Sequence, residues 1–133
     1  MTYLLDTNTC IKYLNGRSEN IRQHLEVKQP QDILLCSVVK AELLYGTMKS
    51  VNPEKNLARL QPFVNRFVSL FFDDGAAEAY GRIRAELEKA GTPIGPNDLL
   101  IAAIVVANDV TLVTNNTREF SRVKGLKFED WEI

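Results

Sequence analysis

The sequence has little of what many catalytic and binding sites require. His24 is the only histidine among 133 residues, which excludes any mechanism that needs two histidines. The two cysteines, Cys10 and Cys36, lack the spacing of a metal-binding motif, so we expect two reduced, buried thiols. The longest apolar run is far shorter than the roughly 20 residues that span a bilayer, and the first residues show no signal-peptide pattern. These absences predict a cytoplasmic protein with no membrane partner.

A strong charge of either sign is also missing. Lysine and arginine number 16 against 17 aspartate and glutamate residues, so the formal net charge is −1. This balance argues against DNA binding through an overall basic surface, although a local basic groove remains compatible with it. The composition is that of a globular protein, with 45% hydrophobic and 25% charged residues. A chain of this length is too short to form two hydrophobic cores of adequate size, so we expect a single domain over residues 1–133.

Short apolar runs that predict strands alternate with stretches that predict helices. Strands are expected at 3–5, 33–36, 68–72, 111–114 and about 126–128, and helices at about 7–15, 18–28, 37–48, 53–67, 74–90 and 96–107. Ser37 is expected to cap the third helix and Leu44 to lie on its buried face, whereas Pro62 should kink or divide the fourth. The alternation predicts an α/β fold with a mainly parallel sheet and helices on both faces.

The chain is organised around the stretch from Pro93 to Asp98, which runs directly into nine apolar residues. Pro96 suits the first turn of a new helix, because the missing N–H has no intrahelical partner there. The following run, LLIAAIVVA, carries no polar side chain, so this helix must be buried on nearly every side. Asp98 therefore lies where a buried helix begins.

Three carboxylates share this position at the edge of apolar sequence, with no cation at helical spacing on the same face: Asp6, Glu42 and Asp98. A carboxylate removed from water pairs with a cation, takes a proton or binds a metal. Carboxylate oxygens suit Mg²⁺ or Mn²⁺ better than Zn²⁺, and such a metal can activate water for attack on a phosphodiester. The acidic residues thus predict hydrolysis at a phosphate.

The predicted topology brings further polar residues to the same place. Parallel sheets bind ligands beyond the carboxyl ends of their strands, where the strand order reverses. Asp6 follows the first strand and Asn116 follows the fourth, so the two share one crevice if those strands are neighbours. Structural explanations stay open for each residue, since Asp6 could only cap a helix, Glu42 could be solvated, Asp98 could only complement the helix dipole and Asn116 could only shape a turn.

Four segments, found in order, cover nearly the whole chain: LLDTN from Leu4, SVVKAELLYG from Ser37, IGPNDLLIAA from Ile94 and LVTNNTREFSRVKGLKFEDW from Leu112. Together they closely resemble the PIN-domain ribonucleases and, more narrowly, the VapC toxins of bacterial toxin–antitoxin pairs. The resemblance implies a three-layer α/β/α PIN-like fold and a Mg²⁺- or Mn²⁺-dependent endoribonuclease. It places the acidic metal-binding positions of the family at Asp6, Glu42 and Asp98.

The resemblance also implies supporting residues, and one departure. The family often has a fourth acidic residue after the fourth strand, where this chain has Asn116, with Glu119 three residues later. Either side chain could serve there, Asn116 through a metal-bound water. Residues expected to orient the carboxylates or hold RNA phosphates are Thr7, Asn8, Thr114, Arg118, Arg122 and Lys124. Turn formation and a solvated charged surface are the competing explanations for these six.

As partners, the resemblance implies an RNA substrate, a VapB-type antitoxin and a second copy of the chain. The NNTREF stretch is similar to the subgroup that cuts initiator tRNA in its anticodon stem-loop. Dimer contacts are expected at the helices carrying Leu57 to Phe67 and Ile11 to Leu14, by analogy only. Two alternatives remain: a receiver-like module that binds magnesium and takes up phosphate, for which Asp73 and Asp74 are the nearest candidates, and a PIN domain that binds RNA without cutting it.

Overall fold

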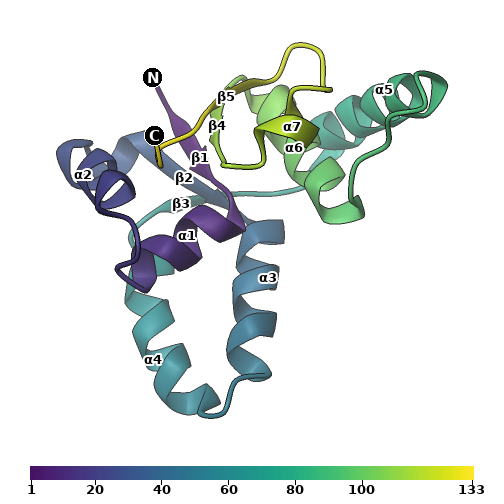
Figure 1. Ribbon diagram of the computed structural model, residues 1–133. Helices are drawn as coiled ribbons and strands as arrows, with labels where there is room; N and C mark the ends of the chain where they lie inside the picture. The colour runs from purple at the N-terminus through teal and green to yellow at the C-terminus, as the bar shows by residue number, and fades with distance from the viewer.

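Five strands form one parallel sheet in the order β3-β2-β1-β4-β5 in the computed structural model, which describes residues 1–133 (Figure 1). The strands are β1 (Tyr3–Leu5), β2 (Ile33–Cys36), β3 (Val68–Leu70), β4 (Thr111–Val113) and β5 (Lys127–Glu129). The central strand β1 pairs with β2 on one side and β4 on the other. The predicted parallel sheet is confirmed, and so is the condition that the first and fourth strands are neighbours.

Seven α-helices and one 3-10 helix connect the strands. They are α1 (Thr7–Leu14), α2 (Glu19–Val27), η1 (Pro30–Asp32), α3 (Ser37–Met48), α4 (Pro53–Val64), α5 (Asp74–Lys89), α6 (Pro96–Asn108) and α7 (Thr117–Phe120). The chain crosses the sheet in one direction from β1 to β3 and in the other from β3 to β5, so right-handed connections place their helices on opposite faces. Figure 1 shows α5, α6 and α7 on one side and α1, α2 and α4 on the other, which gives three layers.

The core lies between these layers and is built from the apolar runs of the sequence. Leu4 and Leu5 of β1 are fully buried, as are Leu112 and Val113 of β4. Helix α6 is buried over most of its length, from Leu99 to Val105 apart from the partly exposed Leu100, which confirms the interpretation of its unbroken apolar run. This burial fixes the first turn of α6, and therefore Asp98, against the sheet.

Three local expectations were wrong. The N-cap of α3 is Cys36 and not Ser37, because β2 passes into the helix without a loop, so the last strand residue occupies the cap position. Leu44 is 39% exposed, since α3 packs through Val39 and Leu43 and one residue further lies about 100° around the helix. Helix α4 continues through Pro62 and ends at Val64, so Pro62 falls in the last turn, where few backbone hydrogen bonds remain to be lost.

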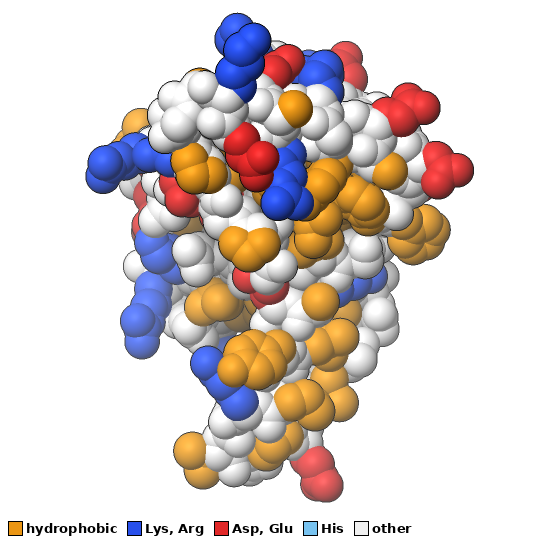
Figure 2. Space-filling view, turned by 90° about the vertical axis from the view of Figure 1, so that its right-hand side faces the viewer, with side chains coloured by type: hydrophobic (Ala, Val, Ile, Leu, Met, Phe, Trp, Pro, Cys, Tyr) orange, Lys and Arg blue, Asp and Glu red, His pale blue; other side chains and the backbone are white.

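The exposed side of α3 carries an apolar stripe. Beside Leu44, Tyr45 and Met48 are 66% and 53% exposed. Figure 2 shows hydrophobic side chains gathered on the lower part of the face that includes this helix. No helix of the structure is both long and apolar enough to cross a membrane.

Candidate active site

The first acidic residue is fixed where β1 ends. The backbone N–H of Asp6 donates to the carbonyl of Val113 at 3.0 Å, which joins the ends of β1 and β4. The Asp6 side chain is the N-cap of α1 and accepts a hydrogen bond from the N–H of Thr9 at 2.8 Å. The capping interpretation is therefore correct as a contact, and it also holds this carboxylate in one orientation at the strand end.

Burial and hydrogen bonds act on Asp6 in opposite directions. Asp6 is only 7% exposed, and this burial raises the pKa of its carboxyl above the ordinary value. Hydrogen bonds from Thr114 and Thr9 lower the pKa and partly offset the burial. The role expected for Thr114, to orient a carboxylate, agrees with this contact. Thr9 was missed by the sequence analysis, although its place three residues after an N-cap signals the backbone contact.

Glu42 is held between two other elements. Its Oε1 accepts a hydrogen bond of 2.6 Å from Thr7 Oγ1 at the start of α1, which agrees with the role expected for Thr7. Its Oε2 lies 3.4 Å from Asn97 Nδ2 in the first turn of α6. Asn97 was missed because no local pattern links residues 55 positions apart. The half-buried Glu42 is thus not a freely solvated residue.

Asp98, Asn116 and Glu119 come together from the first turn of α6 and the start of α7. Asn116 Nδ2 donates to Glu119 Oε2 at 2.6 Å and lies 3.4 Å from Asp98 Oδ2. Burial, a hydrogen bond with Glu119 and the negative charges of Glu119, Glu42 and Asp6 raise the pKa of Asp98 to about 7. The amide of Asn116, with Arg122 and Arg118 nearby, lowers the pKa of Glu119. The carboxyl group of Asp98 therefore takes up a proton more readily than that of Glu119.

The remaining predicted residues contact the acidic groups less directly. Asn8 is exposed, and its side chain makes no hydrogen bond to the three carboxylates. Arg122 donates to the carbonyl of Pro93 at 3.0 Å, so it is tied to the loop that leads into α6. None of the six ion pairs in the structure includes Asp6, Glu42 or Asp98. The acidic side chains therefore lack a cationic partner, as the sequence indicated.

Comparison with known proteins agrees with this geometry. The sequence profile of the PIN domain matches residues 3–126. The tRNA(fMet)-specific endonuclease VapC of Salmonella typhimurium is 41% identical over 131 residues, and the match covers 98% of each chain. That of Shigella flexneri is 43% identical with the same coverage. The chain belongs to the VapC ribonucleases of the PIN-domain family.

The solved VapC structures support the same conclusion for the fold. The crystal structure of DNA-bound VapBC from Salmonella typhimurium contains a chain that superposes with a TM-score of 0.92 at 41% identity, over 98% of both chains. The α/β/α arrangement and the strand order that juxtaposes Asp6 and Asn116 are therefore those of a VapC fold.

PIN-domain nucleases generally use divalent metal ions, and the donor set of this VapC chain fits one. Every side chain that converges here offers carboxylate or amide oxygens, the ligands preferred by hard divalent cations. Burial and the negative charges of Glu119, Glu42 and Asp6 raise the pKa of Asp98, which forms no ion pair with a lysine or arginine. As the side chains stand, no group of three histidine, cysteine or acidic residues is close enough to hold a metal ion. Binding of a divalent ion therefore requires the acidic side chains to move closer together.

Proposed function

We propose that the protein is the endoribonuclease toxin of a toxin–antitoxin pair, in which Asp6, Glu42 and Asp98 hold Mg²⁺ or Mn²⁺ and Asn116 completes the site. The observation that carries the proposal is that these three carboxylates, brought from β1, α3 and α6, influence one another without a cationic partner. A bound divalent ion would activate a water molecule and stabilise negative charge on the phosphate under attack.

The protein side chains divide the remaining work between them. Thr9 and Thr114 keep Asp6 in place, whereas Thr7 and Asn97 fix Glu42 between α1 and α6. Glu119, held by Asn116, is the additional acidic group near Asp98. Arg118 and Arg122 lie close enough to lower the pKa of Glu119, so they can also attract an RNA phosphate to this edge of the sheet.

The substrate class follows from the relatives. The VapC proteins of Salmonella typhimurium and Shigella flexneri are named tRNA(fMet)-specific endonucleases, and both match this chain from end to end. On that basis the substrate is initiator tRNA, cut in its anticodon stem-loop. Unstacked loop bases leave the phosphates between them accessible, as cleavage at a single position requires.

The proposed partners are a VapB-type antitoxin and a second copy of the chain. A structural neighbour is a VapBC complex, and a carboxylate-rich crevice suits an inhibitor with basic residues. The apolar stripe of α3 is the face available to a second copy. The apolar residues of α4, by contrast, are buried within the monomer, among them Leu60, Phe63 and Val64.

The test is to incubate purified, antitoxin-free protein with total bacterial RNA and Mg²⁺ or Mn²⁺, and to map the new RNA ends. Asp6→Asn removes the charge but keeps an oxygen that can accept the capping hydrogen bond, so it should fold and fail to cut. Glu54→Gln, on an exposed residue in the first turn of α4, is the matched control and should cut normally.

Metal-dependent ends confined to the anticodon loop of one tRNA, absent with EDTA and with Asp6→Asn, would support the proposal in full. New ends in other RNAs would support the nuclease activity but refute initiator tRNA as the substrate. Binding of RNA without cleavage in either metal would favour a non-catalytic PIN domain, and uptake of phosphate from a small phosphodonor would favour the receiver-like alternative.

A further inference from the structure

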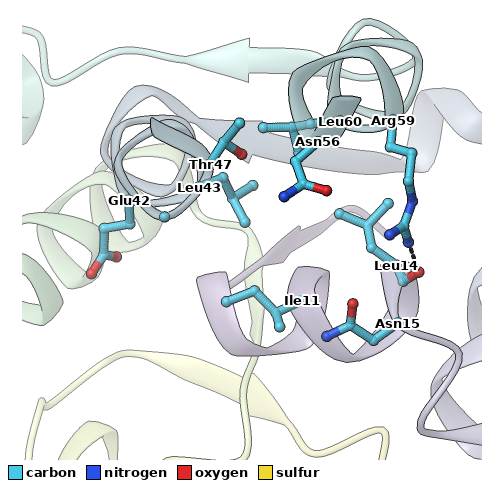
Figure 3. Close-up of a pocket in the computed structure, with 10 residues that line it drawn as sticks. Ile11, Leu14, Asn15, Glu42, Leu43, Thr47, Asn56, Arg59 and Leu60 are labelled. Carbon is cyan, nitrogen blue, oxygen red and sulfur yellow. Dashed lines mark hydrogen bonds between the residues drawn. The ribbon is translucent and has the colours of Figure 1, made fainter. Parts of the chain in front are cut away.

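A cavity of about 280 Å³ lies beside the acidic site, between α1, α3 and α4. Its walls are apolar, formed by Ile11, Leu14, Leu43 and Leu60. Figure 3 shows Glu42 at one end of this cavity and Arg59 at the other. Glu42 belongs both to the acidic site and to the lining, so the cavity lies next to the acidic site.

The cavity also has fixed polar groups among these apolar walls. Arg59 donates to the carbonyl of Leu14 at 2.7 Å, which holds its planar guanidinium at the far end. Asn56 donates through Nδ2 to Ser50 at 2.9 Å, which leaves its carbonyl oxygen as an acceptor. Asn15 caps α1 through its backbone N–H, so its side-chain amide stays available for a ligand. Apolar walls with a few fixed hydrogen-bonding groups are typical of a pocket for a flat, heteroatom-edged molecule.

We propose that this cavity takes one unstacked nucleobase of the RNA substrate, next to the phosphate held at the acidic site; the inference rests on the proposed ribonuclease function. Proteins recognise single-stranded RNA by stacking splayed bases on aromatic side chains or arginine guanidinium planes and by hydrogen-bonding their edges, and extruded bases are also held between apolar side chains. The leucine and isoleucine side chains supply the surface, and Asn15 and Asn56 supply a donor and an acceptor. Arg59 adds a positive charge suited to the flanking phosphate.

An apolar side chain of a protein partner fits the same lining less well. It would fill the space between the aliphatic walls, but it would offer no hydrogen-bonding group to the side-chain amide of Asn15, the carbonyl oxygen of Asn56 or the N–H groups of Arg59 that do not contact Leu14. A nucleobase satisfies such groups with its own ring nitrogens and exocyclic groups. The continuity with Glu42 also favours a substrate over a partner that binds elsewhere.

Gly46 offers a way to fill the cavity without disturbing the fold. It lines the cavity within α3, and a Cβ placed there would meet no atom within 4 Å. Gly46→Leu therefore extends a side chain from the lining, and leucine is a better helix former than glycine. Gly81→Leu is the matched control, because Gly81 lies within α5 with the same free space around its Cβ and no contact with the cavity.

The experiment measures cleavage of a synthetic anticodon stem-loop of initiator tRNA by the wild-type protein and both leucine variants. Gly46→Leu should lower kcat/KM by about tenfold or more, because a substrate that loses its place beside the site is misaligned for the reaction, and Gly81→Leu should leave it unchanged. A series of stem-loops, each with one abasic nucleotide, then locates the base. At one position, the missing base should slow cleavage by the wild-type protein but should not slow cleavage by Gly46→Leu any further.

The outcomes separate this inference from the proposed function. No cleavage by the wild-type protein would refute the nuclease itself. Two results together would overturn the base pocket alone and assign the cavity to a protein side chain. The wild type and both variants would cleave equally, and no abasic position would affect the wild type more than Gly46→Leu. Thermal unfolding and circular dichroism of the variants show whether reduced cleavage reflects lost folding.

Discussion

Some single residues of this protein serve its function and at the same time lower its stability. Asp98 is partly buried beside Glu119, and this burial, together with the neighbouring negative charges, raises its pKa to about 7. Groups of like charge in a buried site are retained where a ligand uses them, and they destabilise the empty site. Replacing Asp98 therefore separates the two effects.

Asp98→Asn should make the metal-free protein more stable and inactive. The amide keeps the shape and can donate to Glu119, and it removes the repulsion from Glu119, Glu42 and Asp6. We expect a gain of about 0.5 to 2 kcal/mol in the free energy of unfolding, the usual size for a stabilising substitution. Urea unfolding with EDTA measures this value. An equal or lower stability than wild type would contradict the repulsion.

The two thiols predict how stability falls at alkaline pH. Burial raises the pKa of Cys10 well above its usual value and also raises that of Cys36. Above the ordinary thiol pKa, about 8.5, the unfolded chain loses these protons while the folded protein keeps them. Stability should therefore decrease as the pH rises beyond that value. Urea unfolding at neutral and alkaline pH tests this, and Cys10→Ala should show a smaller decrease.

The residues of the site could be predicted to different degrees. Asp6, Glu42 and Asp98 stand out because each adjoins apolar sequence, and burial is a property that sequence records. The ties from Thr7 and Asn97 to Glu42 join residues 35 and 55 positions apart, and only the folded arrangement brings them together. Thr7 was expected through a family resemblance. The family resemblance did not point to Asn97. It did point to Asn8, but the side chain of Asn8 makes no hydrogen bond to the carboxylates.

At the scale of helices and strands, the sequence patterns easiest to interpret were those of elements that are buried on all sides. Strands β1 and β2, most of β4 and the run from Leu99 to Ala107 of α6 are apolar, so their place in the core follows directly from composition. Helix α3 was harder, because its polar and apolar residues do not separate into two faces. Its contacts with α1 and α4 decide which side is buried, and Leu44 falls outside them.

The contact between α1 and α3 predicts a positioning effect at Thr7. Thr7→Val should lower cleavage by about tenfold, since a hydrogen bond that orients a metal-binding carboxylate is commonly worth 10- to 100-fold in activity. Thr7→Ser keeps the hydroxyl and should restore most of it. The comparison is kcat/KM at saturating Mn²⁺, with thermal unfolding as the check on folding. Unchanged cleavage by Thr7→Val would show that the hydrogen bond does not matter.

At the scale of the whole molecule, the apolar stripe of α3 predicts self-association. Met48→Glu places a charge in the stripe and should convert a dimer into a monomer in sedimentation experiments. Val27→Glu is the control, because Val27 is an equally apolar residue, 78% exposed, on a different helix. A wild-type protein that sediments as a monomer would refute the α3 interface, and so would a dimer that survives Met48→Glu.

The position of β1 has a consequence for the timing of synthesis. This strand is synthesised before the other four, yet its pairing at the centre of the sheet is completed only when Thr111 pairs with Tyr3. Asp6 likewise makes its contacts with Val113 and Thr114 only after those residues have been synthesised. The same holds for the contacts of Asp98 with Asn116 and Glu119. A nascent chain therefore carries no assembled nuclease until β4 and α7 have been translated. The cell that makes this enzyme is protected from it for the whole of that interval, without any inhibitor.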